Sequence, residues 1–369
     1  MSIYFLHNLN SKKHAERYFF IFKKTYPKKN IFMIKNQEIN NIDFQKGDIV
    51  LSFEIYTFER LKEIAKNVQM QNAKFGLFFG DTIQYYELIY KQFIPLIDFC
   101  FTHELGESSH YEMFAGIPSF DHPIFQTANI EHILSKPKYI EIKKRENYFV
   151  HLGLLDPKRS GRINMIKAMH QTEKNYKLYG PGSNGNKYLD INEIPQRLSN
   201  CVFGLIPCSA SSSDPISSNK QLLEYQFKGK IWEYMISGCI PVIDQAPNIH
   251  RLGLKEGVHF LSVSSFNKEE LNRISRIPSE KLSEISRNAF EFALVNLSIK
   301  NFNEKFDDFY HHLKYLKYSS RKLILNKKPK KIQIAALHYS FFRKKLSIEI
   351  ITSGFYLIKI KNIISKLIN

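Results

Sequence analysis

Two lysines and a glutamate stand close together at the start of an expected helix in the second half of the chain. Lys228, Lys230 and Glu233 belong to the segment FKGKIWEYMISGCIPVI, in which we expect a helix to begin near Lys230 and to end at Gly238. The first turn of a helix presents free backbone N–H groups and the positive end of the helix dipole. With lysines beside it, this helix start predicts a binding site for an anion such as a diphosphate.

Two further groups suited to phosphate follow expected strands of the same half. Arg159 and Arg162 come after the strand YFVHLG, and arginine can donate two parallel hydrogen bonds to phosphate oxygens. Gly180 and Gly182 lie in the turn GPGSNG, where glycine lets the backbone approach a nucleotide closely. Solvated surface charge is the alternative for the arginines, and a plain turn or hinge is the alternative for the glycines.

Polar residues also follow the expected strands of the first half. A carboxylate or an imidazole at such a position could deprotonate an attacking hydroxyl group, and the most suggestive candidates are Asp81, His103 and Glu104. The alternative is that these side chains cap helices, as Asp81 would if a helix follows it. The full set is His7, Asn8, Glu54, Gly80, Asp81, His103 and Glu104.

The elements that position these residues alternate between strands and helices along the whole chain. That alternation predicts two mainly parallel sheets with right-handed crossovers, that is, an α/β protein of two Rossmann-like domains facing across a cleft. In the first half we expect strands at 3–6, 31–34, 48–53, 74–79 and 99–102, with helices at 11–25, 58–70, 83–91 and 108–114. In the second half we expect strands at 148–153, 176–179, 201–207, 240–243 and 259–263, with helices at 162–170 and 230–237.

A polar stretch at 135–147 interrupts the alternation, and we place the linker between the domains there. We expect an N-terminal domain at 1–140, a second domain at 147–310 and a basic helical tail at 311–369. A chain of 369 residues is long enough for two such cores.

The segment around Lys230 resembles a stretch of the GT-B glycosyltransferases, as found in their GT4-like and exostosin-like families. The resemblance extends more weakly over residues 147–275, where LGLLDPKRSGR is similar to the loop that opens the donor domain. The run GLKEGVHFLSVSSFNKEEL is similar to the segment that closes it. The resemblance implies a GT-B fold in which the second domain binds a nucleotide-sugar and the first binds the acceptor.

The same resemblance implies roles for individual residues. Glu233 would contact the ribose hydroxyls, and Arg159 or Arg162 would act with Lys230 to neutralise the leaving nucleoside diphosphate without a metal ion. Glu224 stands nine positions before Glu233 instead of the usual eight, so its contact with the donor sugar competes with a role as a solvated loop acid. We expect no cofactor beyond the nucleotide-sugar, and we favour retention of the anomeric configuration.

Charge is concentrated at the C-terminal end of the chain. The chain carries a net charge of +18, and residues 311–369 hold 14 lysines and arginines against one acid, Glu349. In a helical projection, Tyr356, Ile360 and Leu367 share an apolar face. This pattern predicts an interfacial helix on an anionic membrane. Packing on the body and binding of a polyanion are the alternatives.

Cysteine usage and the N-terminus bear on the cell compartment. The four cysteines, Cys100, Cys201, Cys208 and Cys239, have no metal-ligand spacing, and we interpret them as reduced and mostly buried thiols. The start of the chain reads as a strand and not as a signal peptide, and no apolar stretch is long enough to span a membrane. We expect a cytoplasmic protein on the inner face of the membrane.

Three functions are compatible with these features. The first is transfer of a sugar to a glycan or lipid-linked acceptor in the synthesis of cell-surface polysaccharide or lipopolysaccharide. The second is a GT-B nucleotide-sugar epimerase, which needs no acceptor. The third is a non-enzymatic protein that binds nucleic acid through the tail, although its basic residues alternate with aliphatic side chains more than with stacking aromatic ones. We therefore expect no nucleic-acid partner.

Overall fold

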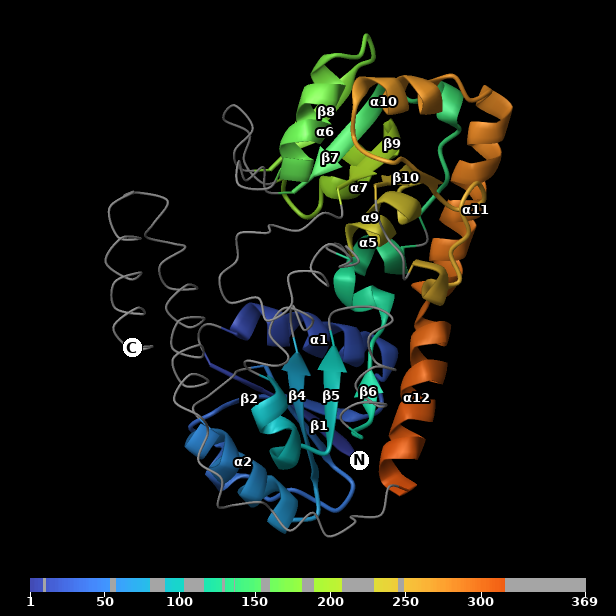
Figure 1. Ribbon diagram of the computed structural model, residues 1–369. Coiled ribbons are helices and arrows are strands. Elements are labelled where there is room, and N and C mark those ends of the chain that lie inside the picture. Colours follow the sequence, from blue (N-terminus) through green and yellow to red (C-terminus); the bar gives the residue numbers. More distant parts are fainter. Residues whose placement is uncertain are drawn as a thin grey trace, which may run out of the picture.

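The computed structural model describes residues 1–8, 11–53, 58–79, 90–102, 116–127, 130–135, 137–153, 160–180, 189–207, 229–244 and 249–315. These residues form two parallel sheets, one above the other in Figure 1, each with helices on both faces. The predicted α/β class with two Rossmann-like domains is therefore confirmed. Among the described residues, the search for helices long and apolar enough to cross a bilayer finds none.

The first sheet contains six strands in the order β2-β1-β3-β4-β5-β6, all parallel. The strands are β1 (Ser2–His7), β2 (Asn30–Lys35), β3 (Ile49–Ser52), β4 (Lys74–Phe79), β5 (Phe99–Thr102) and β6 (Ser119–Phe120). The first five lie where the sequence predicts them. The short helices of this half are η1 (Ile39–Asn41), η3 (Lys91–Leu96), η4 (Pro123–Gln126) and α5 (Ile130–Leu134).

Alternating side chains of these strands build a core on each face of the first sheet. Leu51 packs with helix α1 (Lys12–Thr25), whereas its neighbour Val50 packs with helix α2 (Phe58–Met70) on the opposite face. The predicted helices at 83–91 and 108–114 fall wholly or almost wholly outside the described residues. In Figure 1 the arrowheads of β4 and β5 point toward the second domain, so the carboxyl end of the first sheet faces that domain.

The second sheet has five parallel strands in the order β11-β10-β9-β7-β8. They are β7 (Asn147–Leu152), β8 (Tyr176–Tyr179), β9 (Cys201–Ile206), β10 (Ile240–Ile243) and β11 (Leu261–Ser262). Its helices are α6 (Ser160–His170), α7 (Ile194–Ser199), α9 (Lys230–Ile236), η6 (Ile249–Leu252), α10 (Lys268–Ser275) and α11 (Ser279–Asn296). Helices α6 and α10 pack on one face of the sheet, and α9 and α11 pack on the other.

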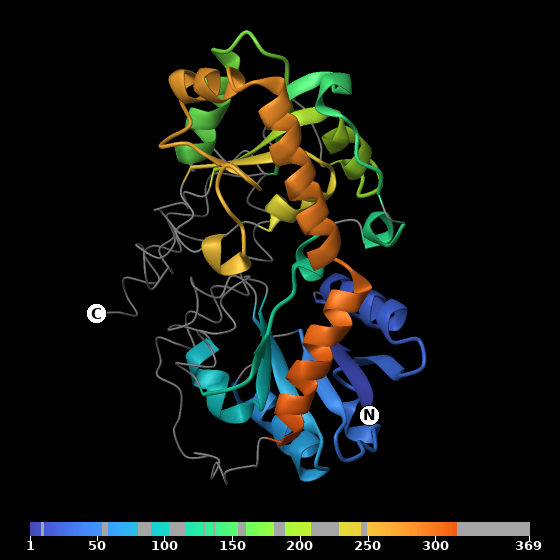
Figure 2. The ribbon, with the colours of Figure 1, turned by 90° about the vertical axis from the view of Figure 1, so that its right-hand side faces the viewer.

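The last described helix, α12 (Ile299–Tyr315), returns to the first domain. Phe302 and Phe306 are fully buried, and their rings lie 5.1 and 4.8 Å from the ring of Phe22 in α1. Figure 2 shows α11 and α12 in orange, running from the second domain down along the first. The helix therefore covers the N-terminal sheet, although the sequence prediction grouped residues up to 310 with the second domain. Residues 316–369, which include most of the predicted tail, lie outside the described part of the chain.

Arg145 is one of the residues that hold the predicted linker against the second domain. Arg145, which follows η5 (Ile142–Lys144), donates to the carbonyl oxygens of Cys201 at 3.0 Å and Gly238 at 2.5 Å. These carbonyls stand at the amino ends of β9 and β10, so the linker is held at that edge of the sheet. Cys100, Cys201 and Cys239 are free and buried, as expected, and Cys208 lies outside the described residues.

Candidate functional site at the carboxyl end of the second sheet

Two glycines let the backbone pack closely at the carboxyl ends of β7 and β8. Gly153 follows β7 and Gly180 follows β8, with φ angles of +136° and +142°. The Gly153 N–H donates to the Tyr179 carbonyl at 2.7 Å. A Cβ atom on Gly180 would lie 2.2 Å from the Gly153 carbonyl oxygen. Both positions therefore require glycine, and Gly180 allows the close approach of another backbone segment. Gly182 lies outside the described residues.

Helix α9 is fixed beside these glycines by Tyr234. Gly204 of β9 lies under the Tyr234 ring, so closely that a Cβ atom would stand 2.3 Å from the ring. The Tyr234 hydroxyl accepts a hydrogen bond from the Leu152 N–H at 2.8 Å. The backbone that ends β7 and the helix that begins at Lys230 are thus held in one arrangement.

Lys230 reaches back from α9 to the end of β7. Its Nζ atom donates to the Leu152 carbonyl oxygen at 2.5 Å, and a Cβ atom on Gly153 would lie 2.8 Å from it. The ammonium group therefore stands at the carboxyl end of the second sheet, which is where ligands bind in open α/β sheets. Lys228 lies outside the described residues.

A buried histidine lies between Lys230 and Arg162. The Nδ1 atom of His151 contacts the Leu205 carbonyl oxygen at 2.9 Å, and because a carbonyl only accepts, this nitrogen carries the proton. Nε2 is then an acceptor, and it has no hydrogen-bond partner among the described residues. Burial holds the pKa of His151 well below 6.5, and Lys230 and Arg162 lower it further. The imidazole is therefore neutral, with two cations beside it.

Arg162 is also buried, with 8% of its surface exposed, in the first turn of α6. Two cations near a neutral imidazole at the end of a strand form an electropositive site, which an anion would complement. The structure thus brings together Lys230, Arg162 and Gly180, which the sequence singled out. It adds His151 and Gly153, which the sequence analysis missed. His151 could have been identified from the sequence, because it is a histidine inside the apolar run YFVHLG.

Glu233 lies one turn after Lys230, at the contact between the two domains. It is 4% exposed, and burial raises the pKa of its carboxyl group to about 7, although Arg17 of α1 lowers that pKa. Nearby, Gly229 packs on Gln126 of η4, and a Cβ atom there would lie 2.2 Å from the Gln126 Oε1 atom. The first turn of α9 therefore touches the N-terminal domain, and Arg17 is a neighbour that the sequence did not reveal.

The raised pKa of Glu233 predicts a pH-dependent stability. The folded protein keeps the carboxyl proton up to a pH of about 7, whereas the unfolded chain releases it near 4.5, so folding binds a proton between these values. We expect this contribution to fall by roughly 2–3 kcal/mol from pH 5 to pH 8. Urea unfolding of the wild type and of Glu233→Gln at both pH values measures it. If the free energy of unfolding changed with pH equally in the two proteins, the raised pKa of Glu233 would be contradicted.

The other predicted site residues divide into two groups. His7 and Asn8 are described: the Asn8 Oδ1 atom accepts from the Ser11 N–H at 3.1 Å, which supports the start of α1. The N-cap of α1 is Ser11, without a side-chain cap hydrogen bond, so Asn8 holds the N-cap residue and is not itself the cap. The remaining candidates lie outside the described residues, and they are Glu54, Gly80, Asp81, His103, Glu104, Arg159 and Glu224.

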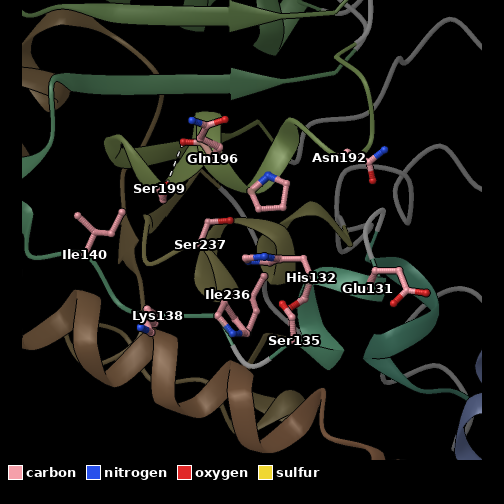
Figure 3. Close-up of a pocket in the computed structure, with 12 residues that line it drawn as sticks. Glu131, His132, Ser135, Lys138, Ile140, Asn192, Gln196, Ser199, Ile236 and Ser237 are labelled. Carbon is pink, nitrogen blue, oxygen red and sulfur yellow. Dashed lines mark hydrogen bonds between the residues drawn. The ribbon is translucent and has the colours of Figure 1, made fainter.

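A separate pocket of about 570 Å³ lies at the opposite edge of the second sheet. Figure 3 shows its lining side chains, which come from α5, the linker, α7 and the C-terminal end of α9. Ser199 and Ser237 stand just before β9 and β10, so the pocket is at the amino ends of these strands. It contains none of the predicted site residues.

Comparison with known proteins places this arrangement in a fold family. No protein-family model and no curated protein matches the sequence. HepE of Anabaena, solved in complex with UDP and glucose, matches the structure with a TM-score of 0.54 and 14% identity, covering 85% of this chain and 100% of HepE. Both domains are included in a match of that extent. The chain has a GT-B fold.

Two other solved GT-B structures match to a similar extent. A glycosyltransferase of Rickettsia africae has a TM-score of 0.54 and 10% identity, and the match covers 86% of this chain and 99% of that protein. Sucrose-phosphate synthase of Thermosynechococcus elongatus has the same TM-score and identity, with 85% of this chain and 99% of the synthase covered. In the GT-B fold described here, Lys230, Arg162 and His151 belong to the C-terminal domain and face the end of its sheet.

Proposed function

We propose that this protein is a glycosyltransferase that takes its sugar from a nucleotide-sugar donor. The observation that carries the proposal is the convergence of Lys230, Arg162 and neutral His151 at the carboxyl end of β7, within a GT-B fold. Two cations at that place suit the diphosphate that links a nucleoside to a sugar. HepE, which shares the fold, was solved with UDP-glucose and with UDP and glucose, which supports a UDP-type donor.

In the proposed reaction, the bond between the sugar C1 and the diphosphate oxygen breaks, and the acceptor hydroxyl oxygen forms a new bond to C1. Negative charge develops on the leaving diphosphate, and Lys230 with Arg162 stabilises it. Because these cations supply the charge, we propose that no metal ion is required. Glu233 would accept hydrogen bonds from the ribose hydroxyls in its ionised form, since a carboxylate is a pure acceptor.

The acceptor proton has two possible destinations. The resemblance to GT4-like enzymes favours retention of the anomeric configuration. In that case an oxygen of the leaving diphosphate takes the proton. If the enzyme inverts, the N-terminal candidates Asp81, His103 and Glu104 include the base.

We propose a glycan or lipid-linked acceptor of cell-surface polysaccharide or lipopolysaccharide synthesis. The basic composition of residues 311–369 supports attachment to the anionic inner face of a membrane.

Release of nucleoside diphosphate from a panel of nucleotide-sugars, with and without membrane extract as the acceptor source, tests the proposal. We expect one donor to be consumed, consumption to rise with the extract, and EDTA to leave the rate unchanged. Conversion of a donor to its epimer without release of nucleotide would favour the epimerase. Absence of both turnover and nucleotide binding across the panel would contradict the function.

A further inference from the structure

Arg17 is a half-buried cation at the contact between the two domains, and two of its three guanidinium nitrogens have no hydrogen-bond partner among the described residues. It lies in α1 of the N-terminal domain. Its Nε and Nη2 atoms are shielded from solvent and have no hydrogen-bond partner among the described residues. Burial lowers the pKa of Arg17, but a guanidinium group stays protonated in proteins. A buried charge with unpaired donors is costly, so such a group needs a partner.

The carboxyl group that acts on Arg17 does not fill this role. Glu233 is the carboxyl group whose charge acts on Arg17, yet neither Nε nor Nη2 donates a hydrogen bond to it. The pKa of Glu233 is still raised to about 7, so this carboxyl group is partly protonated at neutral pH and gives Arg17 an incomplete countercharge. Two nitrogen atoms of the guanidinium group, Nε and Nη2, thus have no acceptor among the described residues.

The surroundings of Arg17 favour an anion. Arg17 acts electrostatically on Glu233, and Glu233 lies three residues, or about one helical turn, after Lys230 along α9. The first turn of α1 contains Lys12 and Lys13 and no acidic residue, which is the reverse of the usual preference at a helix start. The first turn of α9 therefore contains Lys230 and, at Glu233, lies beside Arg17 of the N-terminal domain.

We propose that Arg17 donates two hydrogen bonds to the diphosphate of the bound nucleotide-sugar, so that the donor is held from both domains at once. This inference rests on the proposed function and extends it, because the nucleotide site would otherwise belong to the C-terminal domain alone. A planar guanidinium with two adjacent free N–H groups matches the spacing of two phosphate oxygens. Binding of the donor would then satisfy Arg17 and tie α1 to α9.

The test compares the affinity of nucleoside diphosphates for the full chain and its variants. UDP, GDP, ADP and TDP are titrated calorimetrically, and the tightest is used throughout. We expect Arg17→Gln to weaken its binding by about 10- to 100-fold, as loss of a charged bidentate contact should, and Arg17→Lys to weaken it less. Lys23→Ala, at the far exposed end of α1, is the matched control and should bind like the wild type.

A second measurement separates phosphate binding from a merely structural role. If Arg17 contacts the diphosphate, Arg17→Gln weakens binding by a similar factor in the wild type and in Glu233→Gln. If Arg17 acts only through Glu233, the effect disappears in the Glu233→Gln background, and the inference is overturned. Wild-type affinity in Arg17→Gln overturns it too, while leaving the proposed function intact. Failure of the wild type to bind any of the four nucleotides would instead refute the proposed function itself.

Discussion

Lys230→Ala is expected to weaken nucleoside diphosphate binding and the rate of sugar transfer by about 100-fold or more. The ammonium group of Lys230 stands at the end of β7, held by its 2.5 Å hydrogen bond to the Leu152 carbonyl oxygen. A group already fixed in the free protein stabilises the charge of the leaving diphosphate without first having to be ordered. Lys230 and Arg162 are the two described cations whose charge lowers the pKa of His151. Without the Lys230 charge, Arg162 is the only one of these two cations left in the site.

Calorimetric titration and nucleotide-release rates measure this effect. Lys268→Ala provides a matched control, because Lys268 is likewise the first residue of a helix in the same domain but is exposed at the start of α10. The control should bind and turn over like the wild type. Equal behaviour of Lys230→Ala and Lys268→Ala would contradict the role that we assign to Lys230.

Gly180→Ala is expected to destabilise the protein by at least about 3 kcal/mol. The new Cβ atom would lie 2.2 Å from the Gly153 carbonyl oxygen and 2.6 Å from the Gly153 carbonyl carbon, and both are backbone atoms that no rotamer change can move. The φ angle of +142° adds strain that an L side chain rarely tolerates. Relief of the clash would separate the ends of β7 and β8, which also form the candidate site.

Gly257→Ala is the control that isolates the backbone strain. Gly257 has a φ angle of +71°, and a Cβ atom there would meet nothing within 4 Å. We expect it to cost about 1 kcal/mol. In thermal unfolding, Gly180→Ala should lower the Tm by roughly 6–12 °C and Gly257→Ala by about a third of that. Similar losses for the two variants would mean that the contact between Gly153 and Gly180 is not tight.

The two sheets were predictable because their strands are short apolar runs separated by helical stretches. The run KFGLFF, for example, is short, apolar and rich in phenylalanine, which favours a buried strand, and it forms β4 at Lys74–Phe79. The return of α12 to the first domain was not predictable in this way. Its apolar face is visible in the sequence, but Phe302 and Phe306 give no sign of which domain they cover.

The site was predictable where its residues belong to one local motif. Lys230 and Glu233 stand at the start of an expected helix, and α9 does begin at Lys230. By contrast, the place of Arg17 beside Glu233 depends on how the two domains meet, over more than 200 residues of chain. The neutral state of His151 likewise depends on contacts with Leu205 and Lys230 from other elements. Local sequence patterns contain no such long-range information.

A crystal structure of the protein with a bound nucleoside diphosphate, for which UDP is the first choice, tests the central claim most directly. We expect the two phosphate groups to lie within hydrogen-bonding distance of the Lys230 Nζ atom, beside Gly153 and Arg162 at the carboxyl end of β7. A nucleotide found in the pocket between α5 and α7, or anywhere that leaves the Lys230 ammonium group bonded only to Leu152, would contradict it.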